Sequence, residues 1–175
     1  MSSHPINEPI LDYEAGSEHK SNLKKELNKQ LNEVLEIPCI VNGKKVYTNN
    51  TVIQVVPHNH KHILANVHLA GKKEIEEACK SAIKAQTNWI NIGMENRAQI
   101  FEKCADLLAN KWRMRINAAT MLNQSKTVFQ AEVDAACELI DFWRFNAHYA
   151  REFHDQLQPL VSPEGTLNTT EIRPL

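Results

Sequence analysis

Apolar residues recur at helical spacing along most of the chain, and the most strongly patterned segment covers residues 127–154. On a helical wheel with about 100° per residue, two opposite sides of this segment are apolar and only a narrow sector is polar. Because a helix with two apolar flanks normally lies between layers of a large protein, we expect the chain to be one part of a longer polypeptide. We also expect this helix to keep exposed aromatic surface. The first flank holds Ala131, Ala135, Glu138, Phe142, Phe145 and Tyr149, the second holds Val133, Ala136, Ile140, Trp143, Ala147 and Ala150, and the polar sector holds Asp134, Cys137, Asp141, Arg144 and His148.

Shorter helices are predicted ahead of this segment. Leucines at four-residue steps behind Ser21, a candidate N-cap, predict a helix over residues 21–35 that Pro38 ends. The same apolar spacing predicts further helices over residues 75–89, 98–108 and 115–122. We expect the helices to pack into a small bundle.

Two β-hairpins are predicted between the first two helices. Residues 39–41 and 44–48 flank Asn42-Gly43, which is the strongest short-range hairpin signal. Residues 51–56 and 63–69 form a second pair around a turn that contains Pro57. The chain is therefore expected to be mainly α-helical, with N-terminal β-hairpins at the edge of the helical bundle.

These elements divide the chain into four stretches. Residues 1–37 form an N-terminal helical segment, residues 38–70 the β-hairpins and residues 71–155 a helical part. Residues 156–175 carry Pro159, Pro163 and Gly165 with few apolar side chains, so they predict an extended segment.

Composition excludes several classes of partner. The chain has 175 residues, with 20 basic against 21 acidic side chains, so no charged face predicts binding to nucleic acid or to an anionic membrane. Its apolar runs are too short to span a membrane. Its four cysteines are spaced neither like a zinc site nor like a disulfide framework, which favours buried thiols in a reducing compartment. They are Cys39, Cys79, Cys104 and Cys137.

Two short motifs resemble ligand sites. His58, His60 and His62 alternate and would share one face of a strand, as metal ligands do, but no cysteine or carboxylate cluster lies nearby in the sequence. We therefore favour a solvated turn and predict no metal site. Residues 124–127 resemble the end of a phosphate-binding loop, but Thr120 and Ser125 stand where that loop requires glycine, so we reject it.

The residues also carry a resemblance to a known family. The run over residues 125–147, together with residues 97–101 and 7–11, resembles the N-terminal portion of the aldehyde dehydrogenase superfamily, in its pyrroline-5-carboxylate dehydrogenase branch. The resemblance extends from about residue 7 to residue 175. It implies an α/β fold for the full protein, in which residues 71–155 pack on an NAD-binding domain and residues 156–175 lead into the catalytic region. It also implies that the full-length protein is a homo-oligomer, namely a dimer.

The activity implied by the resemblance is oxidation of L-glutamate γ-semialdehyde to L-glutamate in proline degradation, with NAD as the oxidant. The family's catalytic cysteine and its NAD-binding loop correspond to positions beyond residue 175. We therefore expect no catalytic or cofactor-binding residue in this chain and no turnover by it alone. The alternative function is an inactive helical scaffold or interaction module.

The expected location follows from the same resemblance. Eukaryotic relatives reside in the mitochondrial matrix, and we expect the same here. The alternative is the cytoplasm, because Glu8, Asp12 and Glu14 fall where a transit peptide is poor in acidic residues.

Glu138 and Phe142 are the predicted substrate-binding residues. Glu138 lies in an apolar flank of the long helix, where an uncompensated carboxylate must find a partner or stay protonated. A structural role, with Glu138 leaning toward the polar sector near Asp134, remains open. The resemblance implies instead that Glu138 faces the passage by which the aldehyde enters, in a substrate-orienting or gating role. Phe142, one turn further on, would line that passage, and core packing is the alternative for it.

Overall fold

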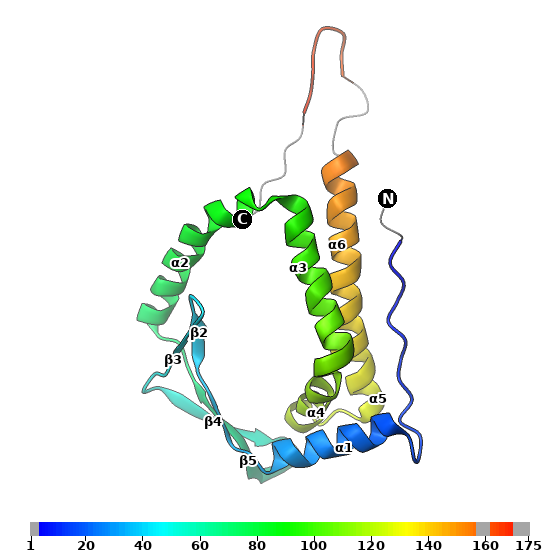
Figure 1. Cartoon of the computed structure of the whole chain (residues 1–175). Helices are drawn as coiled ribbons and strands as arrows, with labels where there is room; N and C mark the ends of the chain where they lie inside the picture. Colours follow the sequence, from blue (N-terminus) through cyan, green and yellow to red (C-terminus); the bar gives the residue numbers. More distant parts are fainter. Residues whose placement is uncertain (1–3, 157–161, 170–175) are drawn as a thin grey trace.

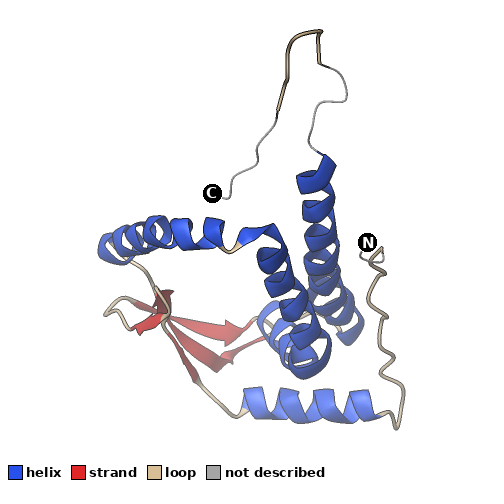
Figure 2. Ribbon diagram, turned by 45° about the horizontal axis from the view of Figure 1, so that its top comes forward, coloured by secondary structure: helices blue, strands red, loops and turns tan. Residues whose placement is uncertain are grey.

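The computed structural model describes residues 4–156 and 162–169, and it places helices around a small set of short strands (Figure 1 and Figure 2). The expected mainly helical chain with strands before residue 70 is confirmed. The helices are α1 (Glu18–Leu31), α2 (Lys72–Asn91), α3 (Gly93–Leu107), α4 (Arg113–Gln124), α5 (Val128–Ala131) and α6 (Glu138–Gln156). The strands are β1 (Leu35–Ile37), β2 (Cys39–Val41), β3 (Lys44–Val46), β4 (Thr51–Val56) and β5 (Asn59–His68).

Both predicted strand pairs form. The β2–β3 hairpin turns at Asn42 and Gly43, whose φ angles of 51° and 72° are those of a tight turn that suits the twist of the strands. The second pair, β4 and β5, is antiparallel, and β1 adds to the other edge of β5 in parallel, giving the order β1-β5-β4. The parallel strand β1 was not predicted, because the leucine spacing assigned Leu35 to the preceding helix.

The first helix differs from its prediction at both ends. It begins at Glu18, and its N-cap is Ser17, whose Oγ accepts a hydrogen bond from the Lys20 amide at 3.2 Å, rather than Ser21. It ends at Leu31, and residues 32–34 connect it to β1. Leu35 continues the helical spacing in the sequence, but its backbone is taken up by pairing with β5.

Two small cores hold the helices together. The first lies between α3, α4 and α6 and contains Ala105, Leu108, Ala136 and Ile140, with Trp143 packed against it. The second lies where α1 and α4 meet the sheet and contains Val56, Leu64 and Leu122. Figure 1 shows α3 and α6 side by side, with α1 crossing below them near α4.

The long predicted helix is interrupted by a wide turn. A π-helical turn, η2 (Glu132–Cys137), separates α5 from α6, and a second one, η1 (Leu108–Trp112), separates α3 from α4. Each π turn adds a residue to the local repeat and so shifts the side chains that follow around the helix axis. A helical wheel drawn with a constant angle per residue therefore misplaces the side chains from residue 132 to residue 137.

Helix α2 departs from the predicted bundle. It extends away from α6 and has no buried residue, with Ile75 57% and Ile83 72% exposed (Figure 1). The prediction of one helical bundle is therefore wrong for α2 and holds for α3, α4 and α6.

The predicted extended tail lies partly outside the described residues. Of residues 156–175, residues 162–169 are described, and they contain a turn in which the Thr166 amide donates to the Pro163 carbonyl at 3.0 Å. Within the described ranges, no helix has the length and apolar character needed to cross a membrane.

Candidate substrate groove on helix α6

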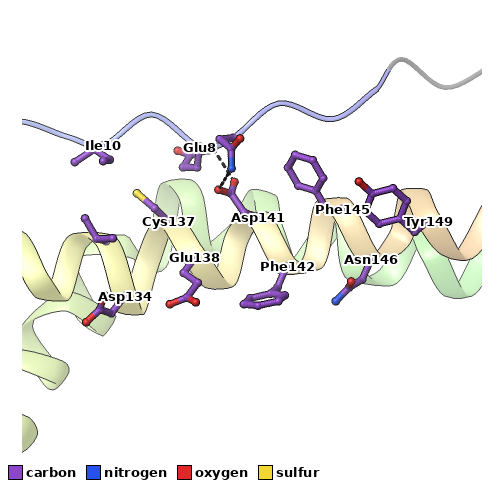
Figure 3. Close-up of a pocket in the computed structure, with 12 residues that line it drawn as sticks. Glu8, Ile10, Asp134, Cys137, Glu138, Asp141, Phe142, Phe145, Asn146 and Tyr149 are labelled. Carbon is purple, nitrogen blue, oxygen red and sulfur yellow. Dashed lines mark hydrogen bonds between the residues drawn. The ribbon is translucent and has the colours of Figure 1, made fainter.

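The long helix carries an open groove of about 720 Å³ on the side that does not face α3. Aromatic and acidic side chains line it, and Figure 3 shows how they lie along the helix. Most of the first predicted flank, including Phe142 and Tyr149, faces this groove, although Ala131 is buried. In the second flank, Ile140 and Ala147 are buried, whereas Val133 lines the groove. The lining residues are Asn7, Glu8, Ile10, Val133, Asp134, Cys137, Glu138, Asp141, Phe142, Phe145, Asn146 and Tyr149.

The two predicted substrate-binding residues both line this groove. Phe142 is 54% exposed and Tyr149 41%, so the expected exposed aromatic surface is present, and the described residues do not bury Phe142. Glu138 is also exposed. Its side chain makes no hydrogen bond or ion pair to any other residue within the described ranges.

The environment of Glu138 therefore differs from the apolar environment that its position on the helical wheel predicted. An exposed carboxylate is solvated, so Glu138 needs neither a cationic partner nor a proton to be stable. Figure 3 shows Glu138 on the same side of α6 as both Asp134 and Phe142, so the structural alternative, in which Glu138 lies toward Asp134, stays open. What the structure adds is an ionisable, solvent-accessible group beside an aromatic wall.

The polar sector of the helix is covered by the start of the chain. Residues 4–13, here termed the N-terminal arm, run alongside α5 and α6 (Figure 1). The Asn7 side-chain amide and the Glu8 backbone amide each donate to the Asp141 carboxylate at 2.7 Å. Arg144 donates to Glu8 at 2.6 Å. The arm thus forms one side of the groove.

Beneath the arm lies a buried ion network that the sequence did not reveal. Glu132 is 0% exposed and Arg113 2% exposed, and the Arg113 guanidinium donates through both Nε and Nη2 to the Glu132 carboxylate. Arg113 Nη1 also donates to Glu8 at 2.5 Å. Glu132 accepts further hydrogen bonds from the Tyr13 hydroxyl and the Asn117 side chain, both at 2.7 Å.

Burial and hydrogen bonding act in opposite directions on the pKa values of Glu132 and Arg113. Burial favours the neutral form of Glu132, but hydrogen bonds from Arg113, Tyr13 and the Leu11 amide outweigh it, so the pKa of Glu132 is lowered. For Tyr13, burial and the neighbouring Glu132 carboxylate raise the pKa above its ordinary value. The Arg113 pKa is raised because hydrogen bonds to Glu132 and Glu8 outweigh its burial. The network therefore stays charged at neutral pH.

A cysteine in the groove is unsuited to nucleophilic attack. Burial, followed by the charge of Glu132, raises the pKa of the Cys137 thiol to about 11. Only the thiolate is a strong nucleophile, so Cys137 is largely unreactive at neutral pH. Cys79 is exposed, whereas Cys39 and Cys104 are half-buried. The expectation of buried thiols therefore holds for Cys137 and is wrong for Cys79.

Two of the alternating histidines form hydrogen bonds with different segments of the chain. His58 Nδ1 lies 2.7 Å from Ser125 Oγ, and His62 Nε2 lies 2.9 Å from the Leu31 carbonyl oxygen. His60 and His62 belong to β5 rather than to a solvated turn, so that expectation is wrong for both. Within residues 4–156 and 162–169, no three His, Cys, Asp or Glu side chains are grouped to hold a metal.

Side chains cap the backbone amides that precede two of the helices. The Gly71 amide, which precedes α2, donates to Glu74 Oε2 at 2.9 Å. The Thr127 amide, which precedes α5, donates to Gln130 Oε1 at 2.9 Å.

Sequence reasoning missed the arm and the ion network for a physical reason. Glu132 and Cys137 turn inward because η2 widens the helix, and no residue pattern marked that turn. Arg113 and Glu132 are 19 residues apart, so no short-range spacing rule applies to them. One signal was present, because Glu132 stands between the apolar residues Ala131 and Val133.

Comparison with known proteins gives a consistent family match. The sequence model described as "Aldehyde dehydrogenase family" matches residues 46–175. The mitochondrial delta-1-pyrroline-5-carboxylate dehydrogenase of Dictyostelium discoideum is 40% identical over 98% of this chain and 30% of its own length. The mitochondrial enzyme of the same name from Homo sapiens is 43% identical over 93% of this chain and 29% of its own. The chain thus spans about 30% of the length of such curated relatives.

Solved structures agree with the sequence comparison. The delta-pyrroline-5-carboxylate dehydrogenase of Mycobacterium tuberculosis, in a crystal structure bound with NAD, superposes with a TM-score of 0.86 and 39% identity. That match covers 91% of this chain and 30% of the other. A 1-pyrroline-5-carboxylate dehydrogenase mutant from Thermus thermophilus has a TM-score of 0.85 and 25% identity, over 94% of this chain and 32% of its own.

Proposed function

Because the chain belongs to the aldehyde dehydrogenase family, we propose that it is the N-terminal part of an NAD-dependent dehydrogenase that oxidises L-glutamate γ-semialdehyde to L-glutamate. The observation that carries the proposal is the 40% identity to one such relative over 98% of the chain. The exposed aromatic face of α6 supports it, since this face lies on a groove that a substrate can reach.

The reaction consumes the aldehyde, water and NAD+ and yields the carboxylic acid, NADH and a proton. NAD, when bound, accepts the hydride from the reacting carbon. The groups that bind NAD and attack the aldehyde are proposed to lie in the part of the relatives' length that this chain does not span. The proposal for this chain is therefore scaffold and substrate guidance.

Glu138 is proposed to orient the substrate as it enters. The semialdehyde carries an α-ammonium group, and the exposed Glu138 carboxylate can accept charge-assisted hydrogen bonds from it. Phe142 is proposed to form the apolar side of the same passage, where it excludes water from the aldehyde chain. Together they would favour an amino-acid aldehyde over an aldehyde without the ammonium group.

The exposed apolar side chains of α2 suggest where the rest of the protein packs. We propose that residues 71–155 pack on the NAD-binding domain, with Ile75 and Ile83 of α2 in the contact. We further propose that the full-length enzyme acts as a homodimer. Its proposed location is the mitochondrial matrix, because several relatives carry that location in their names.

The test is an assay of the full-length protein that contains this chain. Purified protein is incubated with NAD+ and L-glutamate γ-semialdehyde, and NADH is followed by its absorbance. We expect NADH formation with this substrate and a lower kcat/KM with glutarate semialdehyde, which lacks the α-ammonium group. If no aldehyde gives NADH, the proposal fails and the inactive scaffold function takes its place.

A further inference from the structure

We propose that the N-terminal arm is a fixed wall of the groove and that Glu8 is the positioning residue that holds it against α6. The consequence for catalysis rests on the proposed function, because that function supplies the substrate of the groove. The geometry of the arm itself does not depend on it.

Glu8 joins three parts of the molecule through separate atoms. Its Oε1 accepts from Arg113 Nη1, at the start of α4, at 2.5 Å, and its Oε2 accepts from Arg144 Nη1, on α6, at 2.6 Å. Its backbone amide donates to Asp141 Oδ1, also on α6, at 2.7 Å. The Glu8 side chain is 10% exposed, so these contacts are shielded from water and are stronger than ion pairs on the surface.

The carboxylate of Glu8 is not needed to neutralise the buried cation. Arg113 already has the buried Glu132 as its partner, and Arg113 Nη2 also donates to the Pro9 carbonyl oxygen at 2.7 Å. Replacing Glu8 therefore leaves the Arg113–Glu132 pair intact. The additional contact that Glu8 makes is to Arg144, so its specific effect is to link the arm and α4 to α6.

This link acts on the part of α6 that carries the predicted substrate-binding residues. Figure 3 shows the arm above Asp141 and Phe145, while Glu138 and Phe142 point to the other side of the helix. Asp141 directly precedes Phe142 in the chain. Glu8 therefore acts on the passage through the position of α6 rather than by touching the substrate beside Glu138.

The arm also closes the groove on its own side. Ile10 and Asn7 line the groove from the arm, and Figure 3 places Ile10 near Cys137. If Glu8 no longer holds the arm, the part of this wall around Asn7 moves away and the groove widens there, while Pro9 and Leu11 stay held by Arg113 and Glu132. A wider groove binds the semialdehyde more weakly, and the chemical step that follows binding is unaffected.

The first measurement is amide hydrogen exchange on the full-length protein and its Glu8→Gln variant. The Glu8 amide is held by Asp141, whereas the Leu11 amide donates to Glu132 at 2.8 Å and serves as an internal reference. We expect exchange of the Glu8 amide to accelerate by roughly tenfold and that of Leu11 to stay within about twofold, because the opening is local. Equal acceleration at both amides, or none at Glu8, would overturn the proposal.

The second measurement is the kinetics of semialdehyde oxidation. We expect Glu8→Gln to raise KM by roughly tenfold with kcat within about twofold, whereas a merely structural defect lowers kcat together with the fraction of folded enzyme. Glu8→Asp, which keeps the charge, should restore part of the affinity. The matched control is Asp12→Asn, an exposed carboxylate of the same arm that makes no contact with the groove.

The outcomes separate this inference from the proposed function. If the unaltered enzyme forms no NADH, the proposed function fails, and the exchange experiment still decides whether Glu8 holds the arm. If the unaltered enzyme is active and Glu8→Gln leaves KM unchanged, the positioning role of Glu8 is wrong and the proposed function stands.

Discussion

Arg113 and Glu132 form a buried ion pair whose two partners each lie at the edge of a π-helical turn. Arg113 is the first residue of α4, directly after η1, and Glu132 is the first residue of η2. Such turns are frequent at functional sites because they redirect side chains within an otherwise regular helix. Here they turn a cation and a carboxylate toward each other beneath the N-terminal arm, which in turn forms a side of the groove.

Replacing one partner of this pair should be strongly destabilising. Arg113→Leu leaves the Glu132 carboxylate, which is 0% exposed, without its cation, so we expect a loss of about 3–5 kcal/mol in the free energy of unfolding. Urea unfolding followed by circular dichroism measures this loss. The double variant Arg113→Leu/Glu132→Leu should lose less than the sum of the single variants, since it leaves no buried charge unpaired.

The matched control is the exposed ion pair of Lys126 with Asp134, whose atoms are 2.7 Å apart. Lys126→Met should change the free energy of unfolding by no more than about 1 kcal/mol, because water screens this pair. Equal losses for Arg113→Leu and Lys126→Met would contradict the assignment of a buried network.

The sequence predicted local structure well where the signal is local. Asn42-Gly43 specifies its hairpin because both residues tolerate positive φ, and the apolar spacing identified α2, α3 and α4 to within a few residues. The prediction from the sequence failed where pairing between distant segments determines the local structure. Leu35 continues a helical pattern but pairs with Ala65 across the sheet.

For the site, the wheel identified the groove-facing side of α6 but misjudged its electrostatics. It singled out Glu138 as the carboxylate in an apolar environment, whereas the buried carboxylate is Glu132. The error arises because the wheel assumes one constant angle, and η2 breaks that regularity just before α6. The covering of Asp141 by the arm involves contacts over more than 130 residues of sequence, which no periodicity can show.

Truncation of a side chain to alanine should affect the free energy of unfolding differently on the two flanks of α6. Ile140 is 0% exposed in the core with α3, so Ile140→Ala should cost about 2–5 kcal/mol in the free energy of unfolding. Phe142, on the groove, should cost far less when replaced by alanine, although it is the larger side chain. Chemical denaturation of both variants checks this, and a loss for Phe142→Ala as large as that for Ile140→Ala would show that Phe142 is buried in solution.

The cysteines should differ in their reactivity toward alkylating reagents. With iodoacetamide at about pH 8, the exposed Cys79 should be modified readily, since the reagent can reach its thiol. Cys137, with a pKa raised to about 11, should remain unmodified on the same timescale. Mass spectrometry of tryptic peptides gives both rates, and rapid modification of Cys137 in the folded protein would rule out its burial under the arm.

An acid-sensitive contact should join α3 to the end of α6. Hydrogen bonds from Arg151, and then from Gln99, lower the pKa of Glu95 to about 2, against about 4.3 for an ordinary glutamate. Because the folded-state pKa is the lower one, this contact contributes stability above about pH 4.3 and loses it as the pH falls toward 2. A carboxyl-carbon NMR titration measures the pKa, and Arg151→Gln should raise it toward the ordinary value.

The most direct measurement of the central claim is the ratio of kcat/KM for L-glutamate γ-semialdehyde to that for glutarate semialdehyde, determined for the full-length enzyme and its Glu138→Gln variant. Glu33→Gln, which removes an exposed carboxylate outside the groove, is the control. We predict that the unaltered enzyme and the control prefer the amino-acid aldehyde by the same ratio, and that Glu138→Gln lowers this ratio by roughly tenfold because a charge-assisted hydrogen bond is lost. A ratio that is unchanged in Glu138→Gln would contradict the account of the α6 groove as the passage that recognises the substrate.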